Sequence, residues 1–390
     1  GRYFSVFSGI LSIFVLAYLS FIISKKKPLF LVIFLSSFNI FLISYSAETR
    51  AYSTVFLFSL VNICFFFEVF VSKKKNMLFL FLFSFFSVIA LLLHPFTILI
   101  LISELMFLSI YDFRNKKITY INYFIFFAIF ATYLIIEHNY FLSLFNYSPP
   151  EFFVKNPNID FLGNFYFSRF FGSKIMGVIY LFIFVFLLIK NINKIFNNKF
   201  YLFLFILFIL TYAIPITYGY IFNPVLQDKY IIFVLIPIIL LISCLVYELQ
   251  NKKLKNLFII LIFISSITNQ FFEIYNDNID KPDFKKMVNI LNKEEVKNIG
   301  IITVDKLHPY MVDVNHKDIF KERKIIKNYL KQFDSLNTNF VFFNQEEVPH
   351  NLKNIWLLCY TPIVKNECEE NIRIKKDFEI TKKVSSYQLD

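Results

Sequence analysis

The sequence predicts a mainly α fold, a polytopic bundle of about ten transmembrane helices followed by a small α/β domain outside the membrane. Of its 390 residues, 57% are hydrophobic and 56 are phenylalanine, which is more apolar surface than a soluble domain buries. Long apolar runs separated by short polar turns continue to about residue 272. We therefore expect a transmembrane region over residues 1–273 and a soluble extracytoplasmic domain over residues 274–390.

A transmembrane helix needs roughly 20 mostly apolar residues. Ten segments fit this requirement: residues 4–24, 28–45, 52–71, 77–93, 96–111, 118–136, 175–190, 200–217, 230–248 and 257–272. Lysine and arginine cluster at every second connection, at residues 25–27, 73–75, 114–117, 190–199 and 252–255. Basic loops stay in the cytoplasm, so the other connections and the segment after residue 272 are expected outside a multi-pass inner (plasma) membrane protein.

The net charge of +12 is spread over these loop clusters and forms no single basic stripe, so nucleic acid is not an expected partner. After residue 272 the pattern predicts an amphipathic helix over residues 283–295 and buried strands over residues 299–304, 339–344 and 354–360. Alternation of helix and strand favours a partly parallel sheet. Cys359 and Cys368 lie in this outer domain, where a disulfide is one alternative and two free thiols the other.

The first short outer turn carries Glu48 and Arg50 next to Tyr52. A solvated interfacial ion pair is one interpretation of the two charges. The other is that Arg50 and Tyr52 face a cavity near the outer surface, because charge at a membrane boundary is retained mostly where it has a partner, water or a ligand.

Two further outer turns favour the second interpretation. One contains His94, and the other contains Asp228, Lys229 and Tyr230. Cations and aromatic rings would thus gather at one depth on one side of the membrane. Such a group suits a lipid-linked phosphate, which needs positive charge for its head and apolar grooves for its tail.

In order and sidedness, these motifs resemble the membrane glycosyltransferases of the C-type superfamily, in the branch of protein mannosyltransferases and aminoarabinose transferases. The segment "ETRAY" at residues 48–52, "LHPF" at residues 93–96 and "DKYIIFVLIP" at residues 228–237 carry the resemblance. Lys229 stands where the family commonly has arginine, and Pro95 intervenes between the histidine and the aromatic residue. Lysine keeps the charge but lacks the planar fork that binds phosphate through two hydrogen bonds.

The resemblance implies transfer of a sugar from a polyprenyl-phosphate donor to an acceptor glycan, lipid or protein on the outer side. It also implies a catalytic acid in an outer loop that would precede Gly1, so the chain is expected to be part of a longer protein and its catalytic residue stays unknown. Arg2 matches an arginine that is common at the family's second span. The donor-phosphate or substrate-binding candidates are Glu48, Arg50, Tyr52, His94, Asp228, Lys229 and Tyr230.

Two other function classes stay open at this point, a polytopic transporter or lipid flippase and a non-catalytic envelope protein. Transporters place ionisable residues near the midplane, whereas charge here gathers at the outer ends, with Glu68 and Glu104 as the main exceptions. No histidine or cysteine spacing indicates a metal site, no cofactor is evident, and dependence on a divalent metal stays open. The long outer segment at residues 137–174 is either an interfacial aromatic belt or a lid over the acceptor cavity.

Overall fold

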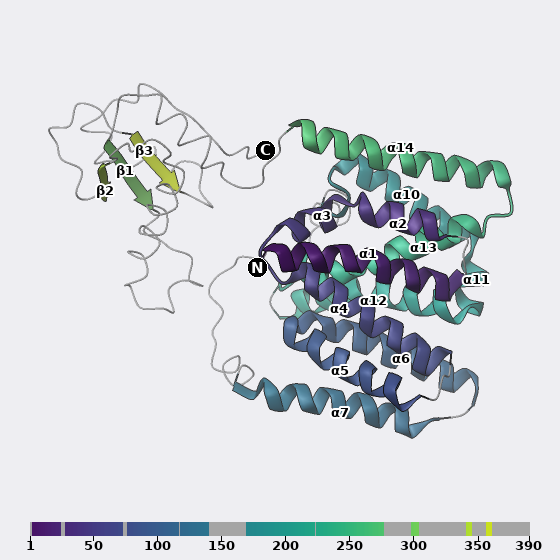
Figure 1. Cartoon of the computed structure of the whole chain (residues 1–390). Coiled ribbons are helices and arrows are strands. Elements are labelled where there is room, and N and C mark those ends of the chain that lie inside the picture. Colours follow the sequence, from purple (N-terminus) through teal and green to yellow (C-terminus); the bar gives the residue numbers. More distant parts are fainter. Residues whose placement is uncertain are drawn as a thin grey trace. The chain divides into compact units, whose positions relative to one another are not determined.

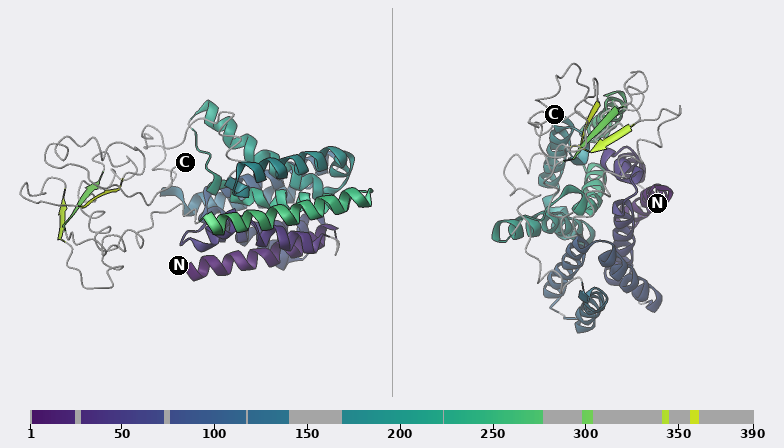
Figure 2. Two further views of the ribbon diagram at one scale, coloured as in Figure 1. Left: turned by 90° about the horizontal axis from the view of Figure 1, so that it is seen from above. Right: turned by 90° about the vertical axis from the view of Figure 1, so that its left-hand side faces the viewer.

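The computed structural model describes residues 2–24, 28–72, 76–116, 118–139, 169–222, 224–276, 298–303, 341–344 and 356–360. The chain divides into two compact units, Gly1–Asn276 and Asp277–Asp390. The first unit is a bundle of helices that run roughly along one direction, with α7 (Tyr120–Ile136) and α14 (Lys252–Asn276) at opposite edges (Figures 1 and 2). The protein is therefore mainly α in the part of the chain that the structure describes.

The helices of the bundle follow the predicted segments closely, and each of the ten predicted spans coincides with a helix or with a pair of consecutive helices. Besides α7 and α14, they are α1 (Arg2–Ser24), α2 (Leu29–Ser37), α3 (Ile40–Ala47), α4 (Tyr52–Phe66), η1 (Phe67–Val71), α5 (Met77–Leu93), η2 (Pro95–Thr97), α6 (Ile98–Arg114), α10 (Lys174–Lys190), α11 (Ile192–Asn197), α12 (Lys199–Ile221), η4 (Asp228–Val234) and α13 (Leu235–Tyr247).

Six helices among the described residues are long and apolar enough to cross a membrane, and the bent pair α2 and α3 makes a seventh. The other three predicted spans, α5, α7 and α10, are helices of 17 residues each, at the short end of the roughly 17–25 residues that spanning helices use. The chain is thus a multi-pass membrane protein by length and composition, and lipid contact follows from its apolar helices.

One predicted span, residues 28–45, is not a continuous helix. It breaks between α2 and α3 with a bend of 54°. Asn39 causes the second helix to start anew, because its side chain accepts a hydrogen bond from the Leu42 amide at 3.0 Å as an N-cap. The hydrophobic pattern alone did not reveal this break, because apolar residues continue on both sides of it.

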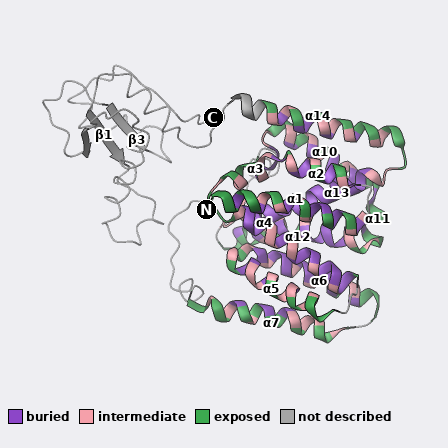
Figure 3. Cartoon of the chain, viewed as in Figure 1, coloured by how far each residue is buried: buried purple, intermediate pink, exposed green. Residues whose placement is uncertain are grey.

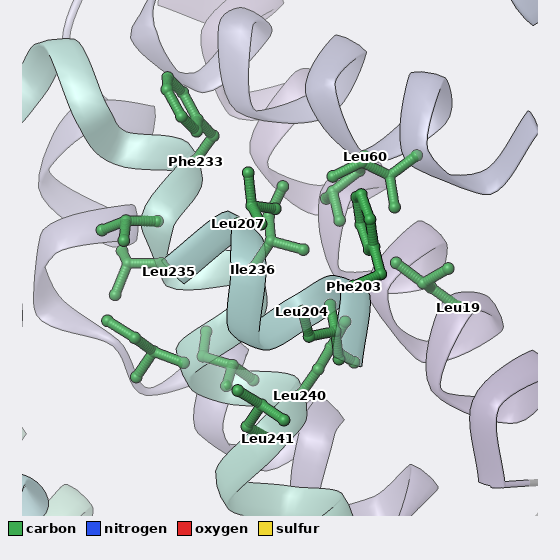
Figure 4. Close-up of a cluster of buried hydrophobic side chains, with 14 of the residues drawn as sticks. Leu19, Leu60, Phe203, Leu204, Leu207, Phe233, Leu235, Ile236, Leu240 and Leu241 are labelled. Carbon is green, nitrogen blue, oxygen red and sulfur yellow. The ribbon is translucent and has the colours of Figure 1, made fainter. Parts of the chain in front are cut away.

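The core of the bundle is centred on α13, which is buried along nearly its whole length (Figure 3). The buried cluster around it contains Ile236 and Leu240 of α13, Phe203 and Leu207 of α12, and Leu60 of α4 (Figure 4). Inside lipid, helices associate through close packing and not through a difference in apolarity. This core therefore fixes the positions of the helix ends, where the polar turns lie.

The second unit contains the strands β1 (Asn298–Thr303), β2 (Val341–Asn344) and β3 (Trp356–Tyr360). They form a parallel sheet in the order β2-β1-β3. All three overlap the segments predicted as strands. The expected helix over residues 283–295 and the pair Cys359 and Cys368 fall on residues whose structure or side chains are not described, so the α/β character of this unit and the disulfide stay predictions.

Candidate functional site

The turn between α3 and α4 presents the first two charged candidates. Arg50 Nε lies 3.4 Å from Glu48 Oε2, and the side chains are 57% and 18% exposed, respectively. The Ser5 hydroxyl on α1 donates to the Arg50 carbonyl at 3.2 Å, which ties the turn to the bundle. The ion pair of the first interpretation is present, and the greater exposure of the arginine leaves its guanidinium accessible to a ligand, as the second interpretation requires.

His94 occupies the break between α5 and η2. Its backbone is extended, and its ring Nδ1 accepts a hydrogen bond from the Phe96 amide at 3.3 Å. Pro95 follows at the first position of η2, where its missing N–H loses no hydrogen bond. The sequence "HPF" therefore forms a capped turn that fixes the histidine ring.

The third turn enters the buried helix α13 through η4. The Lys229 amide donates to Asp228 Oδ1 at 2.8 Å, and Arg169 Nε lies 3.6 Å from Asp228 Oδ2. Lys229 Nζ lies 5.6 Å from the centre of the Tyr230 ring, within range of a cation–π contact. Among the described residues, the Lys229 ammonium forms no ion pair within 4 Å, so it is the cation of this turn that a ligand can neutralise.

Aromatic rings connect the three turns. The Tyr52 and His94 ring centres are 6.1 Å apart, and those of His94 and Tyr230 are 4.8 Å apart. Tyr45 on α3 extends the row, with its ring centre 5.2 Å from that of Tyr52. The charges of Glu48 and Arg50 in the first turn and of Asp228 in the third turn also interact electrostatically with Lys229. The seven candidates predicted from the sequence thus lie together at one end of the bundle. Arg169 and Tyr45 lie beside them, and we call these nine residues the cation–aromatic cluster.

Two side chains of this cluster were missed as site residues. Arg169 was noted only as part of the long outer segment, although its ion pair with Asp228 places it at the cluster. Tyr45 was assigned to the end of a span, although the charges of Asp228, Glu48 and Arg169 act on it. The signal for Arg169 was the sequence "SRFFGSK" ahead of α10, but nothing in that segment indicates which carboxylate it meets.

The segment that carries Arg169 is held in place by two asparagines. Asn39 donates to the Phe170 carbonyl at 3.1 Å, and Asn269 donates to the Phe171 carbonyl at 2.6 Å. Gly172 follows with a φ of +82°, and a Cβ there would lie 2.7 Å from a methyl group of Ile40. The positive φ favours glycine at this position, because residues with a Cβ rarely adopt it.

Burial lowers the pKa of His94 to about 4, and the positive charge of Lys229 acts in the same direction. The imidazole is therefore neutral at pH 7. With His94 neutral, the cluster holds three cations, Arg50, Arg169 and Lys229, against two carboxylates, a balance of 3 − 2 = +1. A site of this charge attracts anions.

No group of three histidine, cysteine, aspartate or glutamate side chains in the described part of the chain could hold a metal ion. A divalent metal in this cluster would have Glu48 and Asp228 as its oxygen donors, and each of these carboxylates already faces an arginine. The described side chains of the cluster therefore suit an anion better than a cation.

Glu104 lies apart from the cluster, within the apolar helix α6. It is fully buried, and neither carboxyl oxygen has a hydrogen-bond partner among the described residues. It is three residues before Phe107 and so lies on the same side of α6, the side on which the Phe107 ring meets Phe66 of α4 and Phe203 of α12. An ionisable group at this depth is costly and is retained mostly for function.

No family model, curated protein or solved structure matches the chain. The comparisons therefore assign neither a family nor an activity, and the similarity to C-type glycosyltransferases rests on the short motifs of the sequence.

Proposed function

We propose that the cation–aromatic cluster binds the phosphate of a polyprenyl-phosphate-linked sugar, and that the protein is an integral membrane glycosyltransferase. The proposal depends above all on the Lys229 ammonium, which has no ion-pair partner among the described residues and whose charge acts on the ring of His94. A phosphate supplies the anion that such a group needs. The apolar surfaces of the surrounding helices suit a prenyl chain.

The two carboxylates of the cluster fit a binding role better than a catalytic one. Glu48 faces Arg50 at 3.4 Å, and Asp228 faces Arg169 at 3.6 Å. Each carboxylate is therefore already engaged with a guanidinium group. We therefore assign neither residue as the base that activates the acceptor, and we propose that both hold the arginines in position for the donor phosphate.

Photolabelling tests the binding part of this proposal. The full 390-residue chain in lipid nanodiscs is irradiated with a photoreactive prenyl phosphate, and the labelled peptides are mapped by mass spectrometry. We expect label on the turns that contain Arg50, His94 and Lys229, and competition by geranyl phosphate but not by uncharged geraniol. Label spread evenly over the apolar helices, or equal competition by geraniol, would refute a phosphate site.

A transporter or lipid flippase is the second candidate, and two observations favour it. The span formed by α2 and α3 is broken, and Glu104 is buried within α6. Broken helices and buried ionisable groups are common in transporters. Product analysis separates the two functions, because a transferase releases prenyl phosphate from the sugar donor, whereas a flippase moves the intact donor between leaflets.

A further inference from the structure

One nitrogen of the His94 ring, Nδ1, takes part in a hydrogen bond within the protein, and the other, Nε2, does not among the described residues. The Phe96 amide can only donate, so His94 Nδ1 must accept with its lone pair. The proton of the neutral ring is then on Nε2. No other described residue shares a hydrogen bond with this ring, so Nε2–H is an unused donor within the described part of the chain.

The surroundings of the His94 ring are those of an anion site. Tyr52 of α4 and Tyr230 of η4 lie next to the ring, at 6.1 Å and 4.8 Å between ring centres. Lys229 is the cation whose charge acts on His94, and Arg50 acts in turn on Lys229. An oxygen of an anion bound between these cations would accept a hydrogen bond from Nε2–H.

We infer that His94 binds the donor phosphate as an uncharged hydrogen-bond donor through Nε2, with its tautomer fixed by the Phe96 amide. This inference rests on the proposed phosphate site and adds a specific role for the histidine. Protonation of the ring would place a hydrogen on Nδ1 and break the bond from the Phe96 amide. The turn that positions His94 therefore also opposes its conversion to a cation.

Two substitutions separate the two nitrogens of the ring. His94→Asn keeps an acceptor near the Nδ1 position and can cap the Phe96 amide, but it does not reach the position of Nε2. His94→Gln places an amide donor near the Nε2 position and loses the cap. If His94 only caps the turn, the asparagine variant should bind phosphate like the parent protein. If His94 binds the phosphate through Nε2, the glutamine variant should bind it like the parent protein.

Geranyl phosphate is the probe, titrated calorimetrically into the full chain in nanodiscs at about pH 7.5, where the neutral ring predominates. A hydrogen bond to a charged group contributes about 1.5–3 kcal/mol, so we expect His94→Asn to raise the Kd by roughly 10-fold or more. His94→Gln is expected to stay within about threefold of the parent protein. The melting temperature of each variant reports whether the turn has remained folded.

The pH dependence provides a readout that a capping role alone would not change. With an uncharged donor, the parent protein and His94→Gln show the same change in Kd between about pH 6 and pH 8. The other titratable groups of the cluster cancel in this comparison, because both proteins contain Tyr45, Glu48, Tyr52, Asp228, Lys229 and Tyr230.

Two results would overturn the inference. One is a parent protein that gains affinity below about pH 6.5 when the glutamine variant does not, because this would show a cationic histidine. The other is binding at the parent level by His94→Asn. Absence of geranyl phosphate binding to the parent protein would instead refute the phosphate site itself.

Discussion

Replacement of Lys229 by methionine tests the charge of the site directly. Methionine preserves much of the apolar stem but removes the ammonium, so the balance of the cluster falls from 3 − 2 = +1 to 2 − 2 = 0. The loss of a charge-assisted contact with a phosphate oxygen corresponds to about 1.5–3 kcal/mol. We therefore expect the Kd for geranyl phosphate to rise roughly 10-fold to 100-fold, and we expect Lys229→Arg to bind close to the parent level.

The size of this effect follows from the partners of each cation. Arg50 and Arg169 are 57% and 61% exposed and each faces a carboxylate, so solvent and the ion pair already screen part of their charge. Lys229 has no ion pair among the described residues, and its loss should weaken binding more than loss of either arginine. Calorimetric titration of the full chain in nanodiscs compares Lys229→Met with Arg50→Met and Arg169→Met under the same conditions.

Lys194 offers a matched control, because its ammonium lies 2.9 Å from Glu248 at the opposite end of the bundle, where α11 lies (Figure 1). Lys194→Met removes the same charge from the whole protein but not from the cluster, and it should leave the Kd unchanged. If Lys229→Met binds geranyl phosphate like the parent protein, or if Lys194→Met weakens binding equally, the reasoning from local charge is wrong.

Three further outcomes are expected. Asp228→Asn removes the ion pair that holds Arg169 in position, so the Kd for geranyl phosphate should rise by roughly two- to fivefold even though the balance of the cluster becomes 3 − 1 = +2, as titration would show. Gly172→Ala adds a Cβ to a residue with a φ of +82°, close to the Ile40 side chain. It should lower the free energy of unfolding by about 1–2 kcal/mol, which thermal unfolding would show as a lower melting temperature. Because the pKa of His94 is lowered to about 4 in the folded protein, the unfolded chain binds the extra proton first and stability falls as the pH drops from about 6.5 towards that value. His94→Gln should therefore show a smaller fall in melting temperature over this range.

The sequence predicted the helices well because long apolar runs have few alternatives in a membrane. It did not predict the break at Asn39, because one capping side chain decides it within a continuous apolar run. The order of the basic clusters placed the seven candidate residues at one end, and the structure brings them together there. Arg169 could not be assigned from sequence, because its position depends on hydrogen bonds from Asn39 and Asn269, which lie 131 and 98 residues from the residues whose carbonyls they bind.

Glu104 decides between the two candidate functions. A transferase that binds its donor at the cluster requires no ionisable group within α6, whereas a transporter that moves a charged substrate uses such a group along the path. Glu104→Gln keeps the shape of the side chain and its capacity for hydrogen bonds but can never carry a negative charge. We expect this variant to fold and to bind geranyl phosphate like the parent protein, because Glu104 lies apart from the cluster. If the parent protein moves the intact donor between leaflets, and Glu104→Gln binds the donor phosphate but no longer moves it, transport is established, because an ionisable carboxyl group that can carry a proton would then be needed away from the binding site.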